Sequence, residues 1–183
     1  EDGTWQREVL EKDGVIRRHI ASTTAKNLLF IVVATPVEEI GRDHDFDWAV
    51  VEPSSYRSII QLAGRVRRHR EPDCPADKPN IAVMQYNLRG LKGEKDVFCR
   101  PGYETKKYRL DSHDLKEAID EAKLTEGITS APRIVKAKTL QHSKKLIDME
   151  HKVMEDFNDV DTPGLKYLRG YTDEYWYLTG LPQ

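Results

Sequence analysis

The fold of this chain is constrained most strongly by a run of seven consecutive apolar residues, Leu28 to Ala34. The run is far too short to cross a membrane as a helix, which takes about 20 apolar residues. It is rich in β-branched residues, and polar residues flank it on both sides. A run of this kind is typical of a strand that is buried on both faces of a parallel sheet. We therefore expect an α/β fold.

Three later segments continue this pattern. Residues 48–51 and 81–84 are short and apolar, as buried strands are. Between them, Ser54 or Ser55 can cap a helix that is predicted over residues 56–68. Strands that alternate with a helix in this way indicate a parallel sheet with flanking helices.

The C-terminal part of the chain has a helical pattern. Asp111 or Ser112 can cap a helix whose apolar stripe covers residues 115–122. A longer helix is predicted over residues 140–157, and the last part of the chain is rich in tyrosine. We therefore expect a smaller, mainly helical C-terminal region.

A change of composition predicts where this region begins. Glycine and lysine become frequent after about residue 86 and remain so up to Gly102. We predict that residues 1–85 form one unit, that residues 86–105 are a linker, and that residues 106–183 form an accessory domain.

Charge and cysteine content narrow the class of protein. The net charge of −2 gives no general attraction to nucleic acid. Cys74 and Cys99 are not spaced as zinc ligands are, and two unpaired thiols indicate a reducing cytosol. We predict no metal site and no nuclease centre in this sequence. No signal peptide or membrane span is recognisable, so we expect a soluble cytoplasmic protein. Because the chain begins without methionine, we also expect it to be a fragment.

The strongest local signal is the segment from Gln61 to Arg68. If the predicted helix continues through it, Gln61, Gly64, Arg65 and Arg68 follow a spacing that places them on one face. A glycine inside a helix costs about 1 kcal/mol relative to alanine, which suggests that a bulky group approaches there. Two guanidinium groups beside it suit a polyphosphate. The alternative is an amphipathic surface helix whose arginines are only solvated.

A second signal follows the first apolar run, at the end of a strand where ligands of α/β sheets bind. The Thr35 hydroxyl can donate to a phosphate, and Gly41 allows the backbone to pass closely. The Asp43 carboxylate can bind a ribose hydroxyl or an arginine. An ordinary acidic loop remains the alternative interpretation.

Together the two segments resemble motifs V and VI of superfamily 2 helicases. Motif V resembles Ala-Thr-x-x-x-Glu-x-Gly-x-Asp over residues 34–43, and motif VI resembles Gln-x-x-Gly-Arg-x-x-Arg over residues 61–68. The stretch from Val33 to Arg70 is most similar to the helicase–nuclease of type I CRISPR systems, subtype F. The resemblance carried by these motifs covers residues 28–85.

This resemblance implies that residues 1–85 are the C-terminal part of the second RecA-like domain of a helicase, with a partial parallel sheet. In such helicases ATP and Mg²⁺ are bound mainly by a first RecA-like domain, which this sequence lacks, since it contains no GxxxxGK[ST] loop. We therefore expect the chain alone to be inactive as an ATPase. In the full-length protein we expect an ATP-dependent DNA helicase with a separate nuclease domain.

The resemblance also implies roles for single residues. Arg65 and Arg68 would act as arginine fingers on the γ-phosphate. Gln61 would position the phosphate end or the attacking water. The nucleotide-binding residues implied are Gly41, Asp43 and Gly64, and Thr35 would contact the backbone of single-stranded DNA.

The partners implied are single-stranded DNA, the crRNA-guided CRISPR surveillance complex, and the missing helicase and nuclease domains. Adaptation proteins and anti-CRISPR inhibitors are further candidates. Two alternatives stay open from the sequence. The chain could be a protein- or DNA-binding module that docks the surveillance complex without catalysis, or an independent α/β domain that binds a nucleotide without hydrolysing it.

Overall fold

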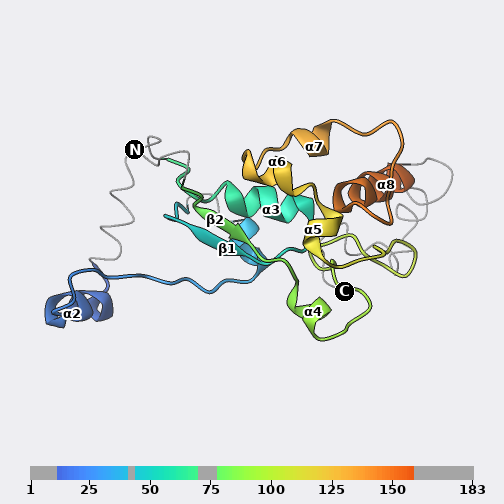
Figure 1. Cartoon of the computed structure of the whole chain (residues 1–183). Helices are drawn as coiled ribbons and strands as arrows, with labels where there is room; N and C mark the ends of the chain where they lie inside the picture. Colours follow the sequence, from blue (N-terminus) through green and yellow to red (C-terminus); the bar gives the residue numbers. More distant parts are fainter. Residues whose placement is uncertain (1–11, 41–43, 70–77, 159–183) are drawn as a thin grey trace.

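The computed structural model describes residues 12–40, 44–69 and 78–158 (Figure 1). These residues form a mixed structure of helices and short strands. Its elements are α2 (Gly14–Ser22), η1 (Pro36–Glu39), β1 (Ala49–Val51), α3 (Tyr56–Ala63), β2 (Ile81–Val83), α4 (Leu88–Leu91), α5 (Leu115–Ala118), α6 (Glu121–Thr125), α7 (Ala131–Ile134) and α8 (Leu146–Asn158).

A small parallel sheet with flanking helices is compatible with the predicted α/β fold. Strands β1 and β2 pair with Ala49 opposite Ile81 and Val51 opposite Val83. Helix α3 lies between them in the sequence, so the order strand, helix, strand is as predicted. In Figure 1, α3 runs beside the two strands, and α6, α7 and α8 lie beyond it.

The beginning of α3 follows the sequence prediction, but its end does not. The Ser55 side chain caps the helix by accepting a hydrogen bond from the Ser58 backbone N–H at 3.0 Å. The helix ends at Ala63, whereas the prediction extended it to residue 68. It ends there because Gly64 is its C-cap and because Val66 forms an isolated parallel bridge with Phe46, which a helical residue could not do.

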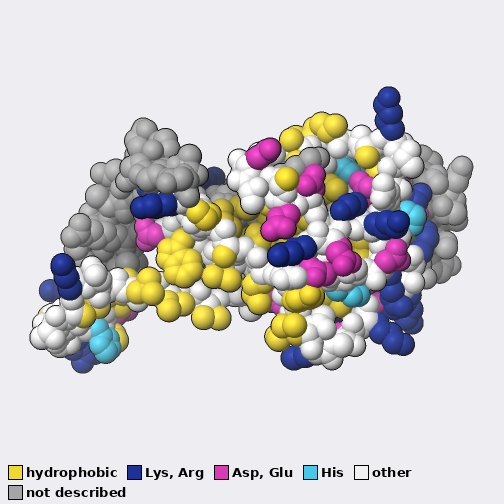
Figure 2. Space-filling view, in the orientation of Figure 1, with side chains coloured by type: hydrophobic (Ala, Val, Ile, Leu, Met, Phe, Trp, Pro, Cys, Tyr) yellow, Lys and Arg dark blue, Asp and Glu magenta, His cyan; other side chains and the backbone are white. Residues whose placement is uncertain are grey.

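The predicted strand over residues 28–34 is wrong for the described structure. This stretch has no regular secondary structure, and its large apolar side chains are exposed, from 46% at Leu28 to 94% at Val33. It runs extended from α2 toward the sheet in Figure 1, and hydrophobic side chains gather over the same part of the molecule in Figure 2. A strand needs a hydrogen-bonded neighbour, and among the described residues β1 and β2 pair only with each other.

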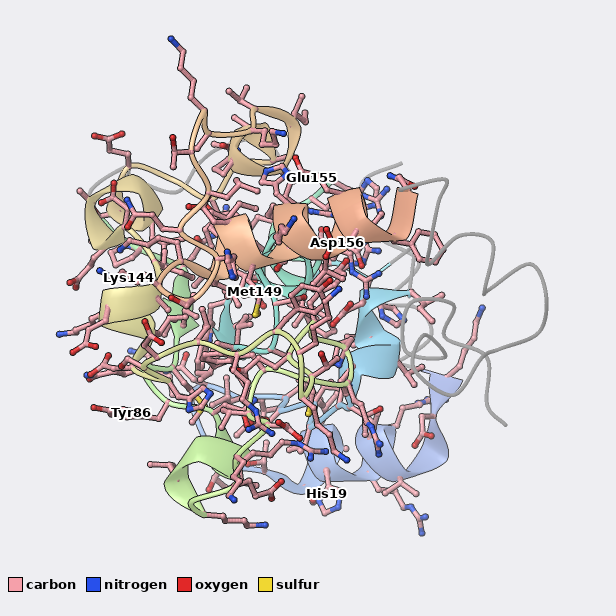
Figure 3. The ribbon with its side chains drawn as sticks, turned by 90° about the vertical axis from the view of Figure 1, so that its right-hand side faces the viewer. His19, Tyr86, Lys144, Met149, Glu155 and Asp156 are labelled. Carbon is pink, nitrogen blue, oxygen red and sulfur yellow. The ribbon has the colours of Figure 1, made fainter. Side chains whose placement is uncertain are left out.

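The core joins the N-terminal and C-terminal halves of the described chain. Val51 and Ile59 belong to the same buried cluster as Phe98 in the expected linker and Leu146 and Met149 in α8. Met149 is fully buried and projects from α8 toward the interior in Figure 3. Residues on both sides of the predicted boundary therefore share one core, and the division into domains stays a sequence-based prediction.

The loop between α4 and α5 is organised by one buried carboxylate. Glu104 is 3% exposed, and its oxygens accept hydrogen bonds from the backbone N–H groups of Val97 (2.8 Å), Phe98 (2.7 Å) and Leu110 (2.9 Å). It also pairs with Nε2 of His113 at 2.8 Å. This one side chain therefore satisfies backbone N–H groups that in a helix or sheet would bond to backbone carbonyls.

The helices of the C-terminal part differ from the prediction in their boundaries. The stripe over residues 115–122 forms two short helices, α5 and α6, because Ile119 adopts an extended conformation between them. Asp114, and not Asp111 or Ser112, caps α5 by accepting from the Lys116 N–H. Helix α8 confirms the longer predicted helix but begins at Leu146. None of the described helices is long and apolar enough to span a bilayer.

Candidate functional site

The residues proposed from the second motif lie at the end of α3 and in the turn that follows it. Gln61 is exposed in its last turn, Gly64 is its exposed C-cap, Arg65 is half-buried and Arg68 is exposed. Thr35 is exposed and immediately precedes η1. Gly41 and Asp43 lie outside the described residues.

The prediction that four of these residues share one helical face is wrong. Only Gln61 is helical, because α3 ends at Ala63 and the chain then turns. Arg67 has a φ of +53°, a left-handed conformation that a helix cannot accommodate. Tertiary pairing therefore overrides the helical pattern that the sequence suggested, and the roles of the four residues stay predictions.

The turn after α3 is instead held against the loop of the first motif. The Phe46 backbone N–H donates to the Arg65 carbonyl at 2.9 Å, and the Arg67 N–H donates to the Phe46 carbonyl at 2.9 Å. The Asp45 carboxylate accepts from the Arg68 N–H at 3.0 Å. These hydrogen bonds place the two motif-bearing loops side by side, although the reason is strand-like pairing and not a shared helix.

The Arg65 side chain has a defined position in this arrangement. Its Nη2 donates to the carbonyl oxygen of Glu39 at 2.9 Å, and its Nε is buried without a hydrogen-bond partner. The Glu39 carbonyl is neutral, so this hydrogen bond does not compensate the positive charge of Arg65. A guanidinium with unused donors can bind a phosphate oxygen through charge-assisted hydrogen bonds.

Glu39 and Arg57 are site residues to which the sequence assigned no role. Glu39 is 7% exposed at the end of η1, and its Oε2 lies 3.7 Å from Nη2 of Arg57 on α3. The glutamate was visible as part of the motif V pattern, but nothing in the local sequence connects it with Arg57. The pair links η1 to the helix that leads into the second motif.

A buried glutamate from α8 completes this group. Glu150 is 2% exposed, its carboxylate accepts from the Tyr56 backbone N–H at the start of α3, and its Oε2 lies 3.6 Å from Nε of Arg133. Burial raises the pKa of Glu150 to about 7, and the hydrogen bond from Tyr56 and the charges of Arg133 and Arg57 oppose this rise only in part.

This raised pKa predicts a pH-dependent stability that Glu150→Gln should remove. The folded state keeps its proton up to about pH 7, whereas an unfolded glutamate loses it near 4.5, so the contribution to stability falls as pH rises between these values. Chemical denaturation measures the free energy of unfolding at about pH 5 and at about pH 8. Between these two pH values it should fall by about 2 kcal/mol more in the wild type than in Glu150→Gln. Equal losses in the two proteins would contradict the assignment. Glu155→Gln, at a half-exposed position in the last turn of α8, is the matched control.

Comparison with known proteins identifies relatives of this chain. Residues 4–71 match a family model described as the C-terminal part of the CRISPR-associated nuclease/helicase Cas3. The chain is 45% identical over 148 residues to a CRISPR-associated nuclease/helicase Cas3 of subtype I-F/YPEST from Pseudomonas aeruginosa, covering 81% of this chain and 14% of that protein.

Two further relatives carry similar descriptions. A nuclease/helicase Cas3 of the same subtype from Pectobacterium atrosepticum is 41% identical over 154 residues, which cover 84% of this chain and 13% of the relative. A nuclease/helicase Cas3 from Methanothermobacter thermautotrophicus is 27% identical over 99 residues, which cover 49% of this chain and 12% of the relative. The chain thus spans only a small part of the length of the proteins it matches.

Proposed function

Because the chain belongs to the family of CRISPR-associated Cas3 nuclease/helicases, we propose that it is part of an ATP-dependent DNA helicase and supplies arginine fingers to ATP held by another domain. The observation that carries this proposal is the pairing of Phe46 with Val66, which brings the two motif-bearing loops together. Arg65 lies in the turn that this pairing shapes, and its guanidinium is oriented by the Glu39 carbonyl.

In this proposal Arg65 and Arg68 stabilise the negative charge that develops on the γ-phosphate, and Gln61 positions the phosphate end or the attacking water. Gly41, Gly64 and Asp43 border the nucleotide. The exposed Thr35 hydroxyl contacts the backbone of single-stranded DNA. Such a contact positions the DNA on the protein but does not read its base sequence. ATP and Mg²⁺ are held mainly by the first RecA-like domain.

We also propose that residues 28–34 become a strand of a RecA-like sheet when the remainder of that sheet is present. Support comes from their extended course and from side chains that are apolar yet 46% to 94% exposed over residues 28–33. An apolar stretch of this kind is stabilised when it adds to a sheet, because pairing satisfies its backbone groups and burial removes its side chains from water.

The proposal predicts that ATP hydrolysis requires a second polypeptide. The 183-residue chain alone should show no ATP hydrolysis, because it has no phosphate-binding glycine loop. Adding a polypeptide that carries the first RecA-like domain and the preceding part of the second should produce hydrolysis that single-stranded DNA stimulates. The release of phosphate is the measurement, and the added polypeptide without this chain is the control.

ATP hydrolysis by the chain alone would refute the proposal, and tight ATP binding without hydrolysis by the chain alone would favour an independent nucleotide-binding domain. Within the family context we propose single-stranded DNA, the crRNA-guided surveillance complex and the nuclease domain as partners. If a polypeptide of residues 86–183 binds the surveillance complex without residues 1–85, the docking alternative gains support for that region.

A further inference from the structure

Four buried polar atoms without hydrogen-bond partners mark one small region of the described structure. Among the residues that it describes, they are Glu39 Oε1, Arg57 Nε, Arg65 Nε and Glu150 Oε2. Buried polar groups are normally satisfied, so incompletely satisfied ones call for an explanation beyond stability. Here all four belong to residues that contact each other or a shared neighbour, and two of those residues lie in the motif-bearing loops.

The contacts among these residues form a continuous chain. Glu150 of α8 holds the N-terminus of α3 through the Tyr56 N–H, and Arg57, the next residue, reaches Oε2 of Glu39 at 3.7 Å. The Glu39 carbonyl then accepts from Nη2 of Arg65 at 2.9 Å. The series of contacts therefore runs from α8, through α3 and η1, to the candidate arginine finger.

The Arg57 side chain lies in the middle of this series of contacts. It is one-third exposed, whereas its partner Glu39 and the carboxylate of Glu150 are almost fully buried. A buried carboxylate is costly to leave without a cation. Loss of the Arg57 charge should therefore displace Glu39, and with it the carbonyl that orients Arg65.

We propose that Arg57 is a positioning residue through which α8 and the loop before β1 set the geometry of Arg65. This proposal rests on the proposed function, because it takes Arg65 as the arginine finger. It assigns α8 a role beyond packing: the docking of Glu150 at the start of α3 is a condition for fast ATP hydrolysis.

The test uses a full-length member of the family that carries this sequence, and it measures kcat and KM for ATP with saturating single-stranded DNA. Arg57→Gln should lower kcat by about 10- to 100-fold, the effect expected of a finger misplaced by about 1 Å, and change KM for ATP by less than about threefold. Arg57→Lys, which keeps the charge, should recover part of this loss. Glu150→Ala, which removes the acceptor of the Tyr56 N–H, should lower kcat in the same direction.

A double substitution separates positioning from general damage. If Arg57 acts through Arg65, Arg57→Gln should cause no further loss of kcat in an Arg65→Ala background. The matched control is Arg109→Gln, which breaks a half-exposed ion pair with Asp96 at 2.7 Å outside this group and should leave kcat unchanged.

The outcomes distinguish this inference from the function on which it rests. A wild-type kcat for Arg65→Ala overturns the proposed function itself. A large loss for Arg65→Ala with a wild-type kcat for Arg57→Gln or for Glu150→Ala overturns only the positioning role. Independent, multiplicative losses in the double variant also overturn it, because they indicate that Arg57 affects hydrolysis by another route.

Discussion

Replacing Arg65 with alanine should lower DNA-stimulated ATP hydrolysis by about 10³- to 10⁵-fold, the range expected for removal of an arginine finger. The Glu39 carbonyl orients the guanidinium through Nη2, and in the proposed function its charge acts on the γ-phosphate. A fixed donor needs no reorganisation when charge develops in the transition state, which is why its removal acts mainly on kcat. Phosphate release by the reconstituted enzyme is the measurement.

The folded state should tolerate this substitution. The side chain contributes one described hydrogen bond to a neutral carbonyl, so its removal should cost only about 1 kcal/mol of stability. Arg65→Lys keeps the charge but loses the forked donors, and it should remain well below the wild-type rate. Arg17→Ala, at an exposed position of α2, is the matched control and should hydrolyse ATP normally. A rate for Arg65→Ala within threefold of the wild type would exclude Arg65 as a finger.

Replacing Gly102 with alanine should cause a larger loss of stability than the same change at any other described glycine. A Cβ atom at this position would lie 1.9 Å from the Phe98 carbonyl oxygen and 2.3 Å from the Ser54 carbonyl oxygen. Both obstacles are backbone atoms, so a change of side-chain rotamer cannot relieve the clash. We expect a loss of more than about 4 kcal/mol, which is a large part of the stability of a typical domain.

The loss should spread beyond the loop that contains Gly102. Ser54 precedes the cap of α3, and Phe98 is fully buried in the shared core, so the backbone must move at both places. Urea denaturation followed by circular dichroism measures the effect, and resistance to proteolysis reports it if the variant does not remain folded. Gly14→Ala meets nothing within 4 Å at the start of α2 and should be neutral or slightly stabilising. An unchanged urea midpoint for Gly102→Ala would contradict the prediction.

Much of the local structure was predictable because its signals lie within a few residues of each other. The apolar segments over residues 48–51 and 81–84 became β1 and β2, and Ser55 caps α3. The apolar stripe over residues 140–157 contains most of α8. In each case the period of the side chains, or a capping side chain close to the backbone it caps, determines the conformation.

Residues 28–34 show where such a local signal is insufficient. Their composition is that of a buried strand, but strand formation depends on a neighbour that supplies hydrogen bonds and covers the side chains. Among the described residues no strand pairs with them, and they stay extended and exposed. Composition can therefore indicate that a segment suits a sheet, but it cannot supply the rest of the sheet.

By itself the sequence determined the α/β character of the fold, its two parallel strands and the residues of the two motifs. Only the tertiary structure decided how those motifs meet: α3 ends at Ala63, Val66 pairs with Phe46, and Arg65 turns to the Glu39 carbonyl. It also decided that Glu150 holds the start of α3 from 94 positions away from Tyr56. Helix periods and caps are encoded within a few neighbouring residues, whereas these contacts depend on packing that brings distant segments together, and no local pattern records them.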